Sequence, residues 1–363
     1  MKLLVLAQIP PPLHGQSVMV RTLVEGLPAH GIGLHHVNLG LSRDAADIGR
    51  WRPGKFVALL RACVRAIITG RRERCDTLYY VPAPGKRGAL WRDWIVMLLC
   101  RPFYRQLVLH WHAAGLDEWL VTRATAFERM VTRALLGRAH LSIVLSPTLQ
   151  GDAGALEPRR IAIVPNGVPD PGEAHALRPA RDKFQVLFLG LGSGEKGIFA
   201  AADAVLAANR AVRAPAEEPK FTLVAAGAFP DAASASRFAS LCAKHPQVLR
   251  HAGLVEGHEK DALLRSSHAF CLPTRYAPEG QPLVLLEAMA HDLPIVATRW
   301  RAIPDTVPPE AELVEPGETD ALAAALVRLR QSPPPAGVFR RHYLARFTPG
   351  HHLAALAAAL KAL

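Results

Sequence analysis

Short apolar runs alternate with loops and helix-like segments along the chain, and this alternation limits the fold more than any other feature. The first run, "KLLVLAQ" at 2–8, ends in the Pro- and Gly-rich loop "IPPPLHGQS", and the helix-like "SVMVRTLVEGL" follows it. Each run is short enough to be one buried strand. Further runs that we interpret as buried strands lie at 77–83, 106–115, 141–147 and 160–168. Strands that alternate with helices favour a parallel sheet with helices on both faces.

The same alternation begins again in the second half, after a change of composition at 169–183. This stretch, "PDPGEAHALRPARDK", is polar and Pro-rich and has no apolar periodicity, so we interpret it as a linker between domains. Strands are then predicted within 184–197, 220–229, 268–274 and 293–298, and helices at 320–331 and in the tail "HHLAALAAALKAL". Because 363 residues suffice for two domains, the sequence predicts two doubly wound α/β domains with a cleft between them.

Composition places the chain among ordinary soluble proteins. Half of the residues are hydrophobic and a fifth are charged. The strongest candidate for a membrane span, "WIVMLLC" at 94–100, is far shorter than the roughly 18 apolar residues that a span needs. The first 20 residues do not resemble a signal peptide, so we expect a cytoplasmic protein. Five scattered cysteines without C-x-x-C spacing argue against a disulfide framework or a zinc site.

The positive charge is concentrated in the first half. Residues 1–180 hold 23 Lys and Arg and 13 Asp and Glu, which is +10 of the total of +12. This excess predicts an anionic partner. The segment 55–70 is helix-like, with Arg61 and Arg65 on one face and Phe56, Leu60, Val64 and Ile67 on another. Such a helix suits the surface of an anionic membrane, although a solvated helix back is equally compatible with the pattern.

Nucleic acid is not an expected partner. The positive charge is diffuse, and we find no interleaving of aromatic and basic residues and no nucleic-acid-binding motif.

A glycine-rich turn with one lysine follows the first apolar run of the second half. The segment "FLGLGSGEKG" contains G-x-G-x-x-G and Lys196, so its backbone could approach a phosphate while the lysine adds charge. A dinucleotide site also needs an acid at the end of the next strand, which instead ends in Ala225, Ala226 and Gly227. A nicotinamide cofactor is therefore disfavoured. A structural turn with a solvated lysine remains an alternative.

Two glutamates, Glu279 and Glu287, enclose seven residues in "APEGQPLVLLEAMAHDLPIVAT". Gly280 and Pro282 suit the start of a helix, with the proline in the first turn. Glu287 follows about two turns later, so we expect both carboxylates on the same broad side. A carboxylate in an apolar helix needs a partner, such as the hydroxyl pair of a ribose. A buried salt bridge is the alternative for Glu287, and a simple helix-terminal carboxylate is the alternative for Glu279.

Two histidines lie in the run "VLHWHAAG". Because His110 and His112 alternate along the predicted strand, we expect them to face opposite sides of it. Taken alone, a histidine on a strand is more often a core residue than a ligand. Gly15, in the loop after the first strand, would allow a ligand to approach the backbone closely.

Together these segments resemble the retaining glycosyltransferases of family four, which have the GT-B fold. The segment "RYAPEGQPLVLLEAMAHDLPIVAT" resembles their E-x7-E signature, and "GSGEKG" resembles their diphosphate-binding lysine loop. The runs "VLHWH" and "IAIVPNGV" are similar to the central histidine strand and the last strand of the N-terminal domain. The loop "PPPLHGQS" is similar to the glycine-rich loop on the acceptor side. The resemblance covers nearly the whole chain.

The resemblance implies a domain organisation as well as a fold. The two Rossmann-like domains would comprise residues 1–168, on the acceptor side, and 184–340, which bind the nucleotide sugar. Residues 169–183 would link them, and the last helix, within 341–363, would cross back to the N-terminal domain.

The same resemblance assigns roles to individual residues. Glu279, against the donor sugar, and His112 would be catalytic, Lys196 would bind the diphosphate, and Glu287 would bind the ribose. The full donor-binding set would be Gly15, Lys196, Gly280, Gln281, Leu283, Val284 and Glu287.

One position departs from the pattern. The family usually has an arginine shortly before the lysine, where this chain has Leu191. Either Arg275 or Arg299 replaces it, or Lys196 and the helix amides suffice for the diphosphate.

These features predict a retaining glycosyltransferase that uses neither a metal nor a cofactor. It would move a hexose from a nucleotide diphosphate sugar to a saccharide or lipid-linked saccharide, in the synthesis of a polysaccharide or cell-envelope glycan. The alternatives are another GT-B enzyme, such as a nucleotide-sugar epimerase or a phosphorylase, or a catalytically weak sugar-nucleotide-binding subunit, which Leu191 would favour. We expect the protein in the cytoplasm, with a peripheral position at an anionic membrane as a further prediction.

Overall fold

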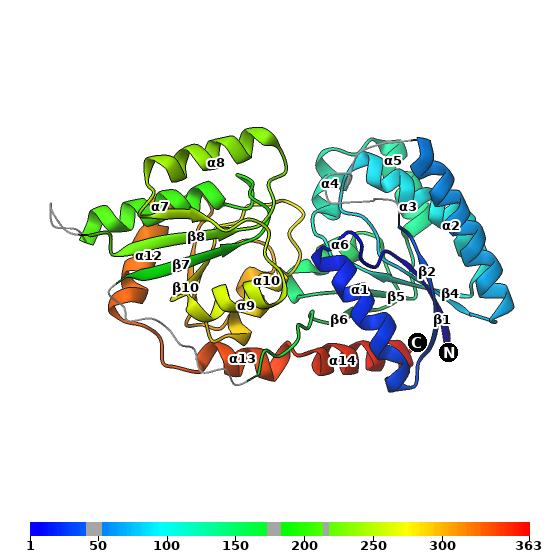
Figure 1. Cartoon of the computed structure of the whole chain (residues 1–363). Coiled ribbons are helices and arrows are strands. Elements are labelled where there is room, and N and C mark those ends of the chain that lie inside the picture. Colours follow the sequence, from blue (N-terminus) through cyan, green and yellow to red (C-terminus); the bar gives the residue numbers. More distant parts are fainter. Residues whose placement is uncertain (41–52, 173–182, 213–217) are drawn as a thin grey trace. The chain divides into compact units, whose positions relative to one another are not determined.

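The computed structural model describes residues 1–40, 53–172, 183–212 and 218–363. Within them, two six-stranded sheets form, and the strands pair in parallel (Figure 1). Each sheet has helices on both faces. The predicted doubly wound α/β class is therefore confirmed for both halves of the chain.

The N-terminal sheet has the strand order β2-β1-β3-β4-β5-β6. Its strands are β1 (Lys2–Ala7), β2 (Gly33–Asn38), β3 (Thr77–Tyr80), β4 (Gln106–His110), β5 (Leu141–Val144) and β6 (Ile161–Ile163). Along β1, Leu3 and Val5 face one helix layer, and the alternating Leu4 and Leu6 face the other, as expected for a strand buried on both sides.

One face of this sheet is covered by α1 (Gly15–Gly26) and α14 (Pro349–Lys361), whose apolar residues share a core with Leu3, Val5 and Tyr79. The opposite face is covered by α2 (Pro53–Arg72), α3 (Arg87–Cys100) and α5 (Ala126–Leu136). Tyr80 reaches this second layer, where its hydroxyl donates a 2.7 Å hydrogen bond to Asp93 of α3. The short helices α4 (Leu116–Thr122) and α6 (Gln150–Gly154) follow β4 and β5.

The C-terminal sheet has the strand order β12-β11-β10-β7-β8-β9. Its strands are β7 (Phe184–Leu189), β8 (Phe221–Ala226), β9 (Leu249–His251), β10 (Ala269–Leu272), β11 (Ile295–Thr298) and β12 (Glu312–Val314). Its helices are α7 (Ile198–Val212), α8 (Ala232–Lys244), α9 (Gly257–Ser266), α10 (Leu283–Ala290), α11 (Ile303–Thr306), α12 (Thr319–Gln331) and α13 (Val338–Arg346).

The chain divides into two compact units, and the division differs from the domains implied by the resemblance at Val168, at 278–281 and at 341–348. Unit 1 comprises Met1–Gly167, Pro278–Gln281 and Pro349–Leu363, and unit 2 comprises Val168–Ala277 and Pro282–Thr348. Four residues of the expected C-terminal domain thus pack with unit 1. Of the predicted linker, residues 173–182 lie outside the described part of the chain.

The C-terminal helix returns to unit 1, as the resemblance implied, but later in the sequence than expected. Leu356 and Leu360 of α14 are buried in the core of the N-terminal sheet. The preceding helix, α13, stays in unit 2, because the hydroxyl of Tyr343 donates a 2.9 Å hydrogen bond to the carbonyl of Val168. The expected segment 341–363 therefore belongs to unit 1 only from Pro349 onwards.

Candidate functional site

The glycine-rich turn joins β7 to α7 in unit 2. Gly197 has φ +90°, and a Cβ there would overlap the carbonyl oxygen of Pro273, so the turn needs glycine at this position. Lys196 precedes it, and its amide donates a 3.1 Å hydrogen bond to the hydroxyl of Ser193. The ammonium of Lys196 lies 4.8 Å from the ring centre of Tyr276. The predicted lysine is thus held at the carboxyl end of β7, where parallel sheets bind ligands.

The loop after β10 is tied to the same turn. The amide of Arg275 donates a 2.7 Å hydrogen bond to the carbonyl of Glu195, next to Lys196. Leu191, at the place of the family's arginine, is 39% exposed and supplies no charge. Arg299, the other candidate replacement, lies 3.6 Å from the carboxylate of Glu315. Of the two candidates, Arg275 is the one whose backbone amide is hydrogen-bonded to the lysine turn.

The helix that carries Glu287 begins later than the sequence predicted. α10 starts at Leu283, and Pro282 is its N-cap rather than a residue of its first turn. Glu279, predicted just before the start of the helix, indeed lies outside it, so helical spacing does not determine its position relative to Glu287. The amides of Leu283 and Val284 are in the first turn, where backbone N–H groups have no acceptor within the helix.

Glu287 is paired with a lysine that sequence reasoning did not identify. The ammonium of Lys260, on α9, donates a 2.7 Å hydrogen bond to Oε1 of Glu287. Both side chains are partly exposed. The salt bridge named as the alternative for Glu287 is thus present, and no pattern around Lys260, 27 residues earlier, indicated it.

The segment 278–281 is fastened to unit 1 by hydrogen bonds. The amide of Ala114 donates to the carbonyl of Pro278 (3.3 Å), and the amide of Asn166 donates to the side-chain oxygen of Gln281 (2.7 Å). Gly280 packs so closely on the carbonyl of His112 that a Cβ would overlap it. The predicted residues Glu279, Gly280 and Gln281 therefore lie beside the loop that carries His112.

The two predicted histidines lie together, not on opposite sides of the strand. The ring centres of His110 and His112 are 4.1 Å apart. The expectation from the sequence is wrong because residues two apart in an extended strand point to the same face. His352 of α14 stacks on His110 with 6.4 Å between ring centres. Sequence reasoning missed His352, since only the return of α14 brings it here.

Burial keeps these histidines neutral. The Nε2 atoms of His110, His112 and His352 are buried and make no hydrogen bond within the described residues. Burial, with smaller contributions from His352 and His14, lowers the pKa of His112 to about 3. Nδ1 of His352 lies 2.7 Å from the carbonyl of Pro165, so in the neutral ring this nitrogen carries the proton. Neutral rings with free Nε2 atoms can exchange hydrogen bonds with the hydroxyls of a sugar.

Gly15 is the first residue of α1, after the loop that follows β1. His14 caps this helix: its Nδ1 accepts a 3.3 Å hydrogen bond from the amide of Ser17, and its own amide donates to the Ser17 hydroxyl. Sequence analysis identified Gly15 but not His14, although the charge of His14 also contributes to lowering the pKa of His112.

Neither a metal centre nor a membrane span is found within the described residues. No group of three or more His, Cys, Asp and Glu in this part of the chain is arranged to hold a metal ion. Over the same ranges, no helix combines the length and the apolar character that crossing a membrane requires.

Comparisons with known proteins agree with this architecture. Residues 183–332 match the family described as glycosyl transferases group 1. An MMP alpha-(1->4)-mannosyltransferase from Mycolicibacterium hassiacum is 46% identical over 78 residues, which are 21% of this chain and 18% of that protein. The present chain therefore aligns with less than a fifth of the length of this curated relative.

Solved structures match over the full length. Sucrose-phosphate synthase from Thermosynechococcus elongatus has a TM-score of 0.75 at 20% identity, covering 100% of this chain and 99% of that one. HepE from Anabaena, solved in complex with UDP, has a TM-score of 0.70 at 18% identity and full coverage of both chains. The lipopolysaccharide outer core galactosyltransferase WaaB follows at 0.68 and 15% identity, covering 100% and 99%. The chain thus has the GT-B fold, and within it residues 183–332 match the group 1 glycosyltransferase family.

Proposed function

We propose that the protein transfers a hexose from a nucleotide diphosphate sugar to a saccharide or lipid-linked saccharide, with retention at the anomeric carbon. The main observation in favour of this proposal is the position of the segment 278–284. Its first half is hydrogen-bonded beside His112 in unit 1, and its second half is the N-cap and first turn of α10 in unit 2. One continuous stretch of chain therefore connects the residues proposed for the sugar with those proposed for the nucleotide.

Unit 2 has the groups that a nucleoside diphosphate needs. Lys196 supplies a positive charge at the end of β7, and the first turn of α10 offers free amides and the positive end of a helix dipole. Glu287 would accept hydrogen bonds from the ribose. HepE, which shares the fold, has been solved with UDP and with UDP-glucose, which supports a nucleotide sugar as donor.

The proposed chemistry depends on charge that develops as the nucleoside diphosphate leaves. Lys196 and the amides of Leu283 and Val284 would stabilise the growing negative charge on the phosphates. Glu279 and neutral His112 would hold the hydroxyls of the transferred sugar, and Gly280 and Gly15 would let backbone approach the donor. The pattern of residues assigns no step to a metal. We further propose that the product is part of a polysaccharide or a cell-envelope glycan.

A second candidate is a sugar-nucleotide-binding protein with little activity of its own. Leu191, exposed where the family has a cation, favours this candidate. The position of Arg275 beside the lysine turn favours the transferase, because it can restore the missing charge.

Two measurements separate these candidates. Thermal shifts with a panel of nucleotides and nucleotide sugars identify the donor, since a ligand at 100 times its Kd stabilises a protein by about 2.7 kcal/mol. Release of nucleoside diphosphate from that donor, and NMR of the transferred sugar's anomeric proton, then test transfer and retention. Lys196→Ala should lower turnover, while the exposed Lys244→Ala should not. Donor binding without turnover for any saccharide acceptor would favour the binding protein, and an inverted product would contradict the retaining mechanism.

A further inference from the structure

Three neighbouring helices of unit 1 expose large apolar side chains on the side that faces away from the sheet. Helices α2, α3 and α5 form one layer (Figure 1). Eight of their large apolar side chains are 45–64% exposed: Phe56, Val57, Val64, Ile68, Trp91, Leu98, Phe127 and Met130. We call this set the apolar face. In the described part of unit 2, exposed side chains of this kind are Leu191, Leu254 and Leu344, which come from three separate places.

The core of unit 1 does not account for the apolar face. α2 buries Leu59, Cys63 and Ala66 against the rest of the unit, at the spacing expected for the inward side of a helix. Val64 and Ile68 lie outside that stripe. Exposed apolar patches of this extent usually mark a surface that binds a partner or a membrane.

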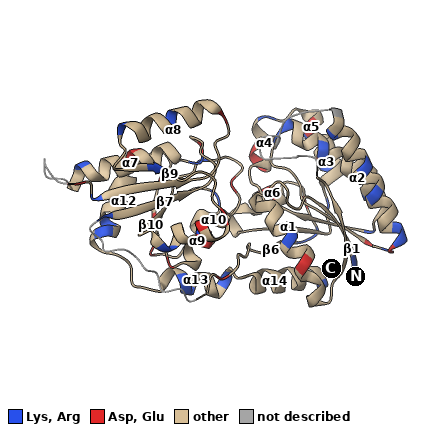
Figure 2. Ribbon diagram, in the orientation of Figure 1, with Lys and Arg blue, Asp and Glu red and all other residues tan. Residues whose placement is uncertain are grey.

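The charge of the same three helices is almost entirely positive. Together they contain nine Lys and Arg and two acids, Asp93 and Glu128. Both acids are buried and paired, Asp93 with Arg92 and Glu128 with Arg87. The blue segments along α2 in Figure 2 show how the basic residues follow this helix. A partner for this layer should therefore carry negative charge.

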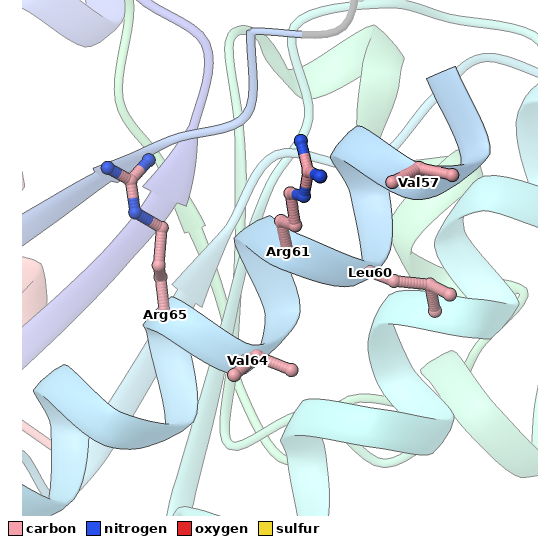
Figure 3. Close-up of a pocket in the computed structure, with 5 residues that line it drawn as sticks. All are labelled: Val57, Leu60, Arg61, Val64 and Arg65. Carbon is pink, nitrogen blue, oxygen red and sulfur yellow. The ribbon is translucent and has the colours of Figure 1, made fainter. Parts of the chain in front are cut away.

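Basic and apolar side chains are interleaved on α2 at close range. A shallow hollow on this helix is lined by Val57, Leu60, Arg61, Val64 and Arg65 (Figure 3). Arg61 and Arg65 extend in one direction from the helix, while the apolar side chains lie along its flank. α2 has 20 residues, but its five Lys and Arg prevent it from crossing a membrane. Helices that mix these residue types lie in the plane of a membrane interface.

We propose that the layer of α2, α3 and α5 binds the surface of an anionic membrane. The apolar face would enter the headgroup region, and Arg61 and Arg65 would contact lipid phosphates. Lipid fits better than a protein partner because every exposed charge on these helices has the same sign, and because the apolar side chains are spread along three helices. The inference does not depend on the transferase assignment.

The test is sedimentation of the full-length protein with vesicles of phosphatidylcholine alone or mixed with phosphatidylglycerol. Binding should require phosphatidylglycerol and should weaken as added salt screens the charges. Arg61→Gln with Arg65→Gln should lower the partition coefficient on the order of tenfold, as each cation near an anionic surface contributes several-fold. Val64→Asn with Ile68→Asn should lower it by a similar factor.

Matched controls come from unit 2. Leu254→Asn removes an apolar side chain that is at least as exposed as Val64 and Ile68, and Arg210→Gln with Arg250→Gln removes two exposed cations. Neither control should change binding. Trp91 reports insertion directly: its fluorescence should shift to shorter wavelength on anionic vesicles, and Trp91→Phe should remove that shift.

Several outcomes would overturn the proposal. They are equal binding to both vesicle types, equal losses in the controls and the α2 variants, and no shift that depends on Trp91. Binding to native membranes but not to pure lipid would assign the surface to a membrane protein instead. If the Asn variants unfold at a lower temperature than wild type, the Arg variants and the Trp91 fluorescence still test the proposal.

Discussion

The ammonium of Lys260 lies 2.7 Å from Oε1 of Glu287, the glutamate proposed to bind the ribose of the donor. This pair explains how a helix as apolar as α10 can carry a carboxylate, because the positive charge of Lys260 on α9 compensates the negative charge of Glu287. The pair also fixes where the carboxylate points. We therefore expect Lys260 to influence nucleotide binding although it has no assigned role.

Glu287→Ala should weaken binding of the nucleoside diphosphate. Hydrogen bonds to a charged group are worth about 1.5–3 kcal/mol, so Kd should rise roughly 10- to 100-fold. Calorimetry with the donor nucleotide measures this, and Glu259→Ala, an exposed acid on α9, is the control. The Lys260–Glu287 pair is partly exposed, so the free energy of unfolding should fall by less than about 1 kcal/mol. Wild-type affinity in the variant would refute the ribose role.

Lys260→Met should raise the same Kd by a smaller factor, because it removes the group that orients Glu287 but leaves the carboxylate. A double-mutant cycle with Glu287→Ala tests the connection, since coupled residues are not additive. We expect the double variant to bind no worse than Glu287→Ala alone. Fully additive losses would show that Lys260 acts on the nucleotide independently.

Gly280→Ala should disturb the site through the backbone. A Cβ at this position would overlap the carbonyl of His112, which is backbone and cannot turn away. Forced overpacking typically costs about 1–3 kcal/mol, and here it should also displace Glu279 and lower turnover. Gly154→Ala is the control, because nothing lies within 4 Å of its Cβ. Equal thermal stability and turnover in Gly280→Ala and wild type would contradict the close packing.

The buried histidines predict that the protein loses stability in mild acid. Their folded pKa values are lowered, that of His112 to about 3, mainly by burial. As the pH falls below the unfolded pKa near 6.5, these histidines bind protons in the unfolded chain but not in the folded chain. The free energy of unfolding therefore decreases as the pH falls, until the folded pKa is reached. Each such histidine adds a slope of about 1.4 kcal/mol per pH unit.

His352→Gln isolates one of these slopes, because glutamine can still donate to the carbonyl of Pro165 but does not titrate. Urea unfolding at pH 7 and at about pH 5 should show a smaller loss of stability in this variant than in wild type. His258→Gln, at an exposed position, should leave the loss unchanged. A wild-type pH dependence in His352→Gln would mean that His352 titrates normally in the folded protein.

The alternation of apolar runs was enough to predict the class of fold, because strands buried on both faces are nearly continuous apolar runs. Strands β9 and β12 escaped prediction because each has three residues at one end of the sheet's strand order and no such run. The placement of 278–281 in unit 1 was also not predictable. It depends on hydrogen bonds to Ala114 and Asn166, which are distant in sequence.

The candidate site was predicted where the signal is local. Lys196 and Gly197 are adjacent in one glycine-rich segment, and the local sequence alone indicates a turn there. Lys260 and His352 were missed because each reaches its partner through tertiary packing rather than through a motif. The error over His110 and His112 had another origin, since the two-residue period of a strand already places them on one face.

At the place of the family's usual arginine, this chain has Leu191. Arg275 lies beside the lysine turn through the bond from its amide to the carbonyl of Glu195, and we propose that it supplies the second positive charge for the diphosphate. Arg275→Gln should therefore lower turnover at saturating donor by about 10- to 100-fold, the size of a lost charged contact in the transition state. Arg299→Gln, whose side chain is paired with Glu315, is the control and should have a small effect. Leu191→Arg restores the usual residue at an exposed position, so it should be tolerated and should rescue much of the activity lost in Arg275→Gln. Such a rescue is expected only if the arginines at positions 191 and 275 contact the same phosphates. An Arg275→Gln variant with full turnover, or a double variant as slow as Arg275→Gln, would show that Arg275 does not replace the missing arginine.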